Sequence, residues 1–314
     1  MNQRFIRRTG KALALAALAV ISFATIGEAG ARAGKEVDWK ALNPAYEGAE
    51  FVRDPQLCAG CHDESTTKYS HTTHARVLGE NGRTALDRLD CESCHGPMSK
   101  HVENPTTEFS LDNIRPAGRS QICLQCHSAG KDQMHWQNGQ HAAAGISCDS
   151  CHVVMERRSQ DDLLSSASQE STCYSCHSDV RASMQKSSHH PVREGKMSCS
   201  SCHNPHGSTG PAMMRRSTIT ETCHSCHQDK RGPFLWEHPP AREDCTSCHA
   251  PHGSNNRSML EAKAHMVCLQ CHSYGGHINL PRYNRTSTPT QQGCINCHVT
   301  PHGSNHPSGS KLTR

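Results

Sequence analysis

The sequence has little of the apolar material from which proteins usually build a core. Hydrophobic residues make up 34% of its 314 residues and aromatic residues only 4%. A chain of this length normally folds into one or two domains, each packed around its own apolar centre. The shortage excludes an ordinary globular enzyme and predicts that no conventional core forms.

Long apolar runs are also scarce. The longest, residues 12–26, has 15 residues, whereas a membrane-spanning helix needs about 20. It follows a cluster of basic residues and precedes Ala31-Arg32-Ala33, which has the form of a cleavage site. We therefore expect residues 1–33 to be a cleaved signal peptide and the mature chain to have no membrane helix of its own.

An excess of one charge is missing from the mature chain. Residues 1–33 hold five of the 33 basic residues and one of the 29 acidic residues, which leaves 28 of each. The formal net charge of +4 therefore belongs to the predicted signal peptide. It gives no support for a nucleic-acid partner.

Cysteine and histidine, by contrast, are abundant, with 20 and 25 residues. The cysteines form ten C-x-x-C pairs, and a histidine directly follows each pair. The pairs are Cys58 and Cys61, Cys91 and Cys94, Cys123 and Cys126, Cys148 and Cys151, Cys173 and Cys176, Cys199 and Cys202, Cys223 and Cys226, Cys245 and Cys248, Cys268 and Cys271, and Cys294 and Cys297. The histidines are His62, His95, His127, His152, His177, His203, His227, His249, His272 and His298.

Three kinds of chemistry compete to explain these pairs. A secreted disulfide scaffold gives no reason for the fixed histidine. Zinc sites often combine two C-x-x-C pairs, but that spacing places no histidine directly behind each pair. In C-x-x-C-H the two thiols bond to the vinyl groups of a haem, and the histidine binds its iron as the proximal ligand. The pattern predicts ten covalently attached haem c groups.

The surroundings of the motifs define five two-haem units, which start near residues 58, 123, 173, 223 and 268. Each unit has a histidine in the linker before its second motif, and four units have another shortly after it. The linker histidines are His74, His141, His190, His238 and His277, and the downstream histidines are His101, His206, His252 and His302. We expect these nine to be distal ligands. A downstream histidine should bind a neighbouring haem, because the porphyrin separates it from the distal face of its own iron.

The second unit departs from this pattern, because Met155 stands where His206 and His252 stand in later units. Either Met155 is the tenth distal ligand, or the tenth imidazole comes from elsewhere, with His135 the nearest candidate. Alternatively, Met155 only packs against a porphyrin. A His/Met haem would have a higher reduction potential than its neighbours. The other histidines, His71, His189, His224, His265 and His306 with His135, are expected at the surface or bonded to propionates.

Ten haems in so short a chain imply that the porphyrins supply the missing apolar core. We expect a mostly irregular chain in which short α-helices carry the motifs, with almost no β-sheet. Residues 34–57 should form a haem-free lead-in, residues 58–304 the decahaem domain, and residues 305–314 a polar tail.

Several longer segments resemble a known family. These are Cys226 to His238, the C-x-x-C-H-x-P-H-G-S blocks at Cys199 and Cys245, and the ending His302 to Gly309. The chain resembles the periplasmic decahaem cytochromes of the MtrA, MtoA, PioA and DmsE type. The resemblance implies an elongated wire of bis-histidine haems inside an outer-membrane β-barrel porin. It also implies partners on both sides, namely periplasmic or inner-membrane carriers and an outer-surface multihaem cytochrome.

Three functions fit these observations. One is a porin-sheathed conduit for extracellular electron exchange, serving Fe(II) oxidation or mineral reduction. The second is a soluble periplasmic shuttle to a reductase, and the third is a multihaem reductase. Reductases of this kind need an iron with an open distal position, often marked by C-x-x-C-K, and the sequence has no such motif. We expect an electron-transfer protein without catalytic residues, located in the periplasm at the outer membrane.

Overall fold

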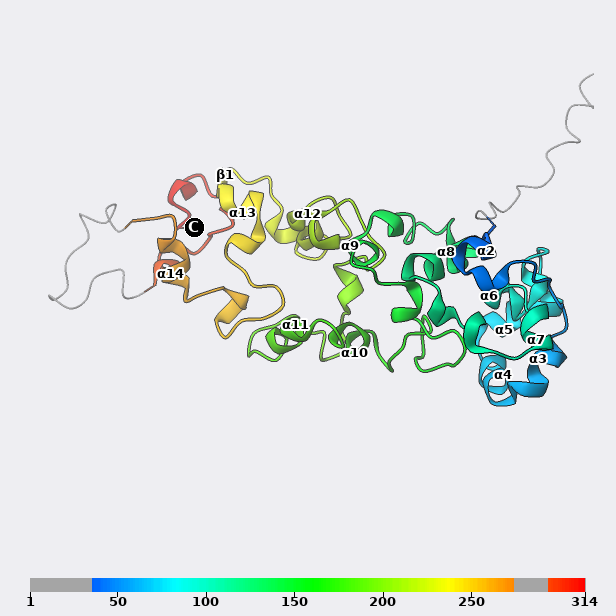
Figure 1. Cartoon of the computed structure of the whole chain (residues 1–314). Helices are drawn as coiled ribbons and strands as arrows, with labels where there is room; N and C mark the ends of the chain where they lie inside the picture. Colours follow the sequence, from blue (N-terminus) through cyan, green and yellow to red (C-terminus); the bar gives the residue numbers. More distant parts are fainter. Residues whose placement is uncertain (1–35, 274–292, 314) are drawn as a thin grey trace, which may run out of the picture.

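The computed structural model describes residues 36–273 and 293–313, so the predicted signal peptide and His277 lie outside the described residues. The molecule is elongated, and the chain advances from α2 (Trp39–Leu42) at one end to α14 (Ala264–Leu269) at the other (Figure 1). In the middle of the molecule, α9 (Gln140–Ala143) and α12 (Ile219–His224) lie in one row. The helices α10 (Gln169–Tyr174) and α11 (Ser178–Ser183) lie in a second row opposite them.

Most elements are single helical turns. The other α-helices are α3 (Pro55–Cys61), α4 (Asp63–Ser70), α5 (Thr73–Val77), α6 (Glu92–His95), α7 (Ser99–Glu103), α8 (Pro116–His127) and α13 (Pro239–Glu243). The 3-10 helices are η2 (Pro44–Tyr46), η3 (Gly79–Asn81), η4 (Asp87–Leu89), η5 (Thr107–Phe109), η6 (Leu111–Asn113), η7 (Trp136–Asn138), η8 (Cys148–Ser150), η9 (Cys199–Ser201), η10 (Pro211–Met213), η11 (Gln228–Lys230), η12 (Cys245–Ser247), η13 (Arg257–Met259), η16 (Cys294–Asn296) and η17 (Gly309–Lys311).

Sheet is almost absent from the described residues. Strand β1 (Trp236–Glu237) pairs antiparallel with β2 (Gly303–Ser304), with Trp236 opposite Ser304. The predicted fold class, short helices in a mostly irregular chain, is confirmed. None of the helices within residues 36–273 and 293–313 has the length and apolar character to cross a membrane.

Each C-x-x-C-H motif forms one helical turn. The N–H of the motif histidine donates to the carbonyl of the first cysteine, as from His62 to Cys58 at 3.0 Å. Residues i, i+3 and i+4 of a helical turn share one face. Both sulfurs and the imidazole therefore lie on the same side of each turn. The first motifs of the units occupy the C-terminal ends of α3, α8, α10, α12 and α14, and the second motifs occupy α6, η8, η9, η12 and η16.

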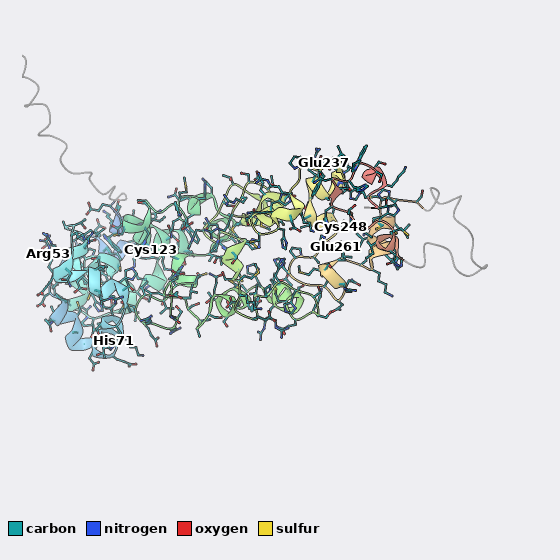
Figure 2. The ribbon with its side chains drawn as sticks, turned by 180° about the vertical axis from the view of Figure 1, so that it is seen from behind. Arg53, His71, Cys123, Glu237, Cys248 and Glu261 are labelled. Carbon is teal, nitrogen blue, oxygen red and sulfur yellow. The ribbon has the colours of Figure 1, made fainter. Side chains whose placement is uncertain are left out.

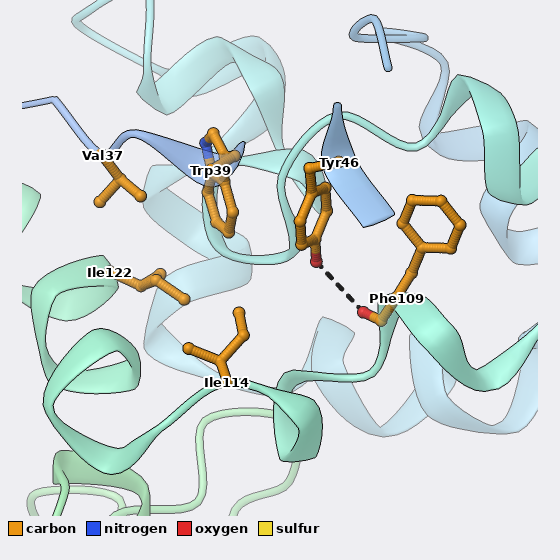
Figure 3. Close-up of a cluster of buried hydrophobic side chains, with 6 residues drawn as sticks. All are labelled: Val37, Trp39, Tyr46, Phe109, Ile114 and Ile122. Atoms are coloured by element: carbon orange, nitrogen blue, oxygen red, sulfur yellow. Dashed lines mark hydrogen bonds between the residues drawn. The ribbon is translucent and has the colours of Figure 1, made fainter. Parts of the chain in front are cut away.

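A small apolar core forms at the N-terminal end, although the composition predicts none. It consists of Val37, Trp39, Tyr46, Phe109, Ile114 and Ile122 (Figure 3). The Tyr46 hydroxyl donates to the carbonyls of His95, at 2.8 Å, and Phe109, at 3.1 Å. Burial raises the pKa of Tyr46 to about 12. The hydrogen bond from Tyr46 to the carbonyl of His95 holds the lead-in against the second motif. Three of the few aromatic residues, Trp39, Tyr46 and Phe109, pack together in this core.

The C-terminal tail packs against the fourth and fifth units. Trp236 Nε1 donates to the carbonyl of His306 at 3.0 Å, and Nδ1 of His298 lies 2.6 Å from the carbonyl oxygen of Lys311. Residues 305–313 therefore pack against the helical units that precede them. This packing could not be predicted from the polar composition of the tail, because the contacts use the backbone carbonyls of His306 and Lys311, which residues of any type would provide.

A test of the N-terminal core is Gly96→Ala. Gly96 has φ +80° and ψ −173°, a region that residues with a side chain rarely adopt, and a Cβ there would stand 2.6 Å from Cε3 of Trp39. We expect the substitution to lower the free energy of unfolding by about 2–4 kcal/mol. Guanidinium unfolding followed by far-ultraviolet circular dichroism measures this loss.

The matched control is Gly145→Ala. Gly145 also has a positive φ, +76°, but a Cβ there would meet nothing within 4 Å. Gly145→Ala should lower the free energy of unfolding only by the backbone strain, about 1 kcal/mol. Equal losses for the two variants would show that contact with Trp39 is not what fixes Gly96.

Candidate haem sites

The structure brings motif histidines and predicted distal histidines together in pairs. Eight pairs have ring centroids 6.0–6.2 Å apart. They are His62 with His101, His127 with His74, His152 with His206, His177 with His141, His203 with His252, His227 with His190, His249 with His302, and His272 with His238. Two imidazoles on opposite sides of one metal, each nitrogen about 2 Å from it, hold their ring centres roughly 6 Å apart. Each pair is spaced to hold one iron between its rings.

Seven of these pairs join different units. A linker histidine faces the first motif of the following unit, as His141 faces His177. A downstream histidine faces the second motif of the preceding unit, as His206 faces His152. The exception is His101, which faces His62 of its own unit. Two such pairs therefore connect the second unit to the third, the third to the fourth and the fourth to the fifth, and one pair connects the first to the second.

Backbone carbonyls determine which imidazole nitrogen faces the partner ring. Nδ1 of three linker histidines lies 2.7–2.8 Å from proline carbonyls: His141 from Pro205, His190 from Pro251 and His238 from Pro301. Nδ1 of four motif histidines lies 2.6–2.9 Å from carbonyls: His152 from Asp162, His203 from Ala212, His249 from Ser258 and His298 from Lys311. A carbonyl only accepts, so Nδ1 carries the proton and Nε2 keeps its lone pair for a metal.

The P-H-G blocks therefore contribute more than their histidines. In Pro251-His252-Gly253, the proline carbonyl orients His190 while His252 faces His203. Gly253 has φ +143°, and a Cβ there would stand 2.1 Å from the carbonyl oxygen of Ser183. Glycine thus lets the block approach the backbone of the preceding unit. Sequence reasoning identified only the histidines, although the repeated proline and glycine were the available signal.

Burial favours the neutral form of several of these imidazoles. It is the largest cause of a lowered pKa at His74, His95, His206, His252 and His302. Neutral imidazole is the form that binds a metal. The burial of these rings therefore suits them to be ligands.

Cysteines of successive motifs lie near one another along the molecule. Within a unit, the first cysteines of the two motifs are close enough to interact, and the neighbouring Cys123 thiol lowers the pKa of Cys148. These pairs are Cys58 with Cys91, Cys123 with Cys148, Cys173 with Cys199, Cys223 with Cys245, and Cys268 with Cys294. Between units, the second cysteines are close enough for their charges to interact: Cys94 with Cys126, Cys151 with Cys176, Cys202 with Cys226, and Cys248 with Cys271. The two kinds of neighbouring pair alternate from the first motif to the last.

This donor set fits haem c. Each site offers two thiols on one face of a helical turn, and all 20 cysteines are free of disulfide bonds. The paired imidazoles would hold the iron of a haem from its two sides, and the porphyrin would supply the remaining ligands. Within the described residues, no group of three or more His, Cys, Asp or Glu could hold a metal by itself.

Two motif histidines stand outside the eight pairs. For His298, the candidate partner His277 lies outside the described residues. His95 faces no second imidazole at this spacing among the described residues. Of the histidines expected at the surface, His71 is exposed at the end of α4 (Figure 2). His189 lies 3.2 Å from a carboxylate oxygen of Glu194.

Repeated C-x-x-C-H turns with paired imidazoles define a multihaem c-type cytochrome, an electron-transfer protein with covalently bound haem. Residues 141–182, 189–232 and 238–277 match the family model for the doubled CXXCH motif, and residues 98–153 match that for cytochrome c554 and c-prime. The chain is 36% identical over 281 residues to the multiheme cytochrome MtrA of Shewanella baltica, covering 85% of this chain and 84% of that protein. It belongs to the MtrA family of multihaem cytochromes.

The doubled-motif matches coincide with the imidazole pairs. Each match begins at or next to a linker histidine and continues beyond the first motif of the following unit. The match to residues 141–182 thus contains both His141 and His177. Each match spans the second motif of one two-haem unit and the first motif of the next. It therefore contains one linker histidine together with the motif histidine that this linker histidine faces.

The assignment of distal histidines can be tested by His206→Ala. This variant removes one imidazole from the site of His152, and we expect about one haem of the protein to change from low-spin to high-spin ferric iron. Electron paramagnetic resonance of the oxidised holoprotein measures the change. His135→Ala is the control, because the His135 backbone lies beside the same block, near Gly207. A high-spin signal from His135→Ala, or none from His206→Ala, would overturn the assignment.

Proposed function

We propose that each of the ten motifs holds one haem c and that the protein is a wire carrying electrons between periplasmic carriers and the cell exterior through an outer-membrane porin. The observation that carries the proposal is the alternating series of neighbouring cysteines from Cys58 to Cys294. Each thiol would bond to the edge of its own porphyrin, so neighbouring cysteines would bring the edges of successive haems near one another.

Electron tunnelling becomes steeply slower with distance, so a conductor needs a series of cofactors without a gap. At the boundaries between units the second cysteines are near enough for their charges to interact, as Cys151 and Cys176 are. The elongated shape then converts the nine short steps between ten haems into transfer over the length of the molecule (Figure 1).

The paired imidazoles favour electron transfer over catalysis at the eight sites where they occur. With His177 and His141 on one iron, for example, both axial positions are filled and no substrate can bind. We assign the other seven pairs in the same way, and His277 as the distal ligand at His298. Bis-histidine ligation also changes little between oxidation states, because neither ligand has to leave.

The envelope location is supported by the predicted signal peptide and by membership of the MtrA family. A porin around the cytochrome would face the lipid, so that a chain with a polar surface could reach both sides of the membrane. A wire has no intrinsic polarity. The reduction potentials of the partners at its two ends therefore decide whether the protein serves Fe(II) oxidation or mineral reduction.

Proteoliposomes test this function. We expect vesicles with the holoprotein in its porin to reduce a trapped redox dye when a membrane-impermeant reductant is added outside. Vesicles with the porin alone should not. A double variant, Cys173→Ala with Cys176→Ala, removes a haem from the middle of the series, and we expect it to reduce the rate to the porin-only level.

Intact-mass measurement accompanies this experiment and should show ten haems in the protein and nine in the double variant. Full conduction by the nine-haem variant would contradict a continuous wire. Recovery of the protein only as a soluble periplasmic monomer, with no barrel co-purifying, would contradict the conduit and favour the shuttle.

A further inference from the structure

The haem at His95 lacks an assigned sixth ligand, and the connections between units indicate where that ligand should come from. Between the second and third units, two pairs cross the boundary: His141 with His177, and His206 with His152. The next two boundaries are also crossed twice. The first boundary has the linker pair of His74 with His127. Its second crossing should run from the segment after His152 back to His95.

The segment after His152 has the same fold as the segments that carry His206 and His252. In each, Nδ1 of the motif histidine bonds to the carbonyl of a residue with positive φ: Asp162, Ala212 or Ser258. In each, the chain then forms an antiparallel bridge with that histidine. The residue three positions after the motif histidine is His206 in the third unit, His252 in the fourth and Met155 in the second.

The charged residues beside Met155 lie near the first unit. The pKa of Lys68 in α4 is raised chiefly by its hydrogen bond to Glu64, but Glu156 and Arg158 also act on it. The neighbouring residue, Tyr69, has its pKa raised by burial and by the nearby Asp90, Cys94 and Cys91. Two adjacent residues of α4 are therefore within electrostatic range of the segment after His152, in the case of Lys68, and of Cys91 and Cys94 beside His95, in the case of Tyr69.

The alternative imidazoles are less well placed. The carbonyl oxygen of His135 would be 2.6 Å from a Cβ on Gly207, so His135 lies beside the site of His152, which already has His206. His71 is in the first unit but is exposed at the end of α4 (Figure 2). The remaining unassigned histidines, His189, His224, His265 and His306, belong to later units.

We propose that the thioether sulfur of Met155 is the sixth ligand of the iron bound by His95, so that the second haem of the series is His/Met while the imidazole pairs are bis-histidine. This inference rests on the proposed haem occupancy and not on the porin. A thioether is a soft ligand that favours Fe(II) and raises the reduction potential. The second haem would then hold an electron in preference to its neighbours and make the N-terminal end of the wire electronically distinct.

The test uses the purified ten-haem holoprotein. We expect the near-infrared magnetic circular dichroism of the ferric form to show one thioether-to-iron band beside the bis-histidine bands. Met155→His should abolish the thioether band while every haem remains low-spin. In potentiometric titration it should also remove the component that reduces at the highest potential. Met155→Leu should abolish the band and yield about one high-spin haem.

Two controls make the outcome decisive. Met134→Leu changes an exposed methionine, with 66% of its surface accessible, and should leave the band intact. His71→Ala should also leave every haem low-spin. The proposal is overturned if the ten-haem protein lacks the band, if the band survives Met155→Leu, or if His71→Ala creates the high-spin haem. A mass showing no haem at Cys91 and Cys94 would instead overturn the occupancy itself.

Discussion

The rest of the structure depends on one interaction, the pairing of two histidines from different parts of the chain at a spacing that fits one iron. His141 and His177, or His206 and His152, are far apart in the sequence, and their rings are about 6 Å apart in the structure. Because seven of the eight pairs join neighbouring units, axial ligation would also cross-link the chain. A haem series held in this way does not need the apolar core that the composition cannot provide.

The N-terminal end is built differently. There Tyr46 reaches the carbonyl of His95 from a small aromatic core, which gives this end a packed protein structure of its own. Among the described residues, the same end contains the one pair within a unit, His62 with His101, and the proposed ligand Met155 lies in the neighbouring second unit.

Much of the site could be predicted from the sequence, because covalent haem attachment fixes both residue types and spacing. The haem sites and the short-helix fold followed from the C-x-x-C-H motifs and the family from longer segments such as Cys226 to His238, and eight of the nine histidines predicted as distal ligands lie opposite motif histidines. The pairing could not be derived, because it depends on how the linkers fold back. The roles of the Pro251 carbonyl and of Gly253 were hidden because they act through the backbone. The Tyr46 core was hidden because its few residues are dispersed over the first 122 positions.

The most direct test of the account is a crystal structure of the holoprotein with iron located by its anomalous scattering. The account predicts ten irons in one unbroken series in the order of the motifs. Eight should lie midway between the paired rings, as between His190 and His227, and the iron at His95 should lie next to the sulfur of Met155. Irons whose two axial ligands come from one unit throughout, or a gap between neighbouring units, would contradict it.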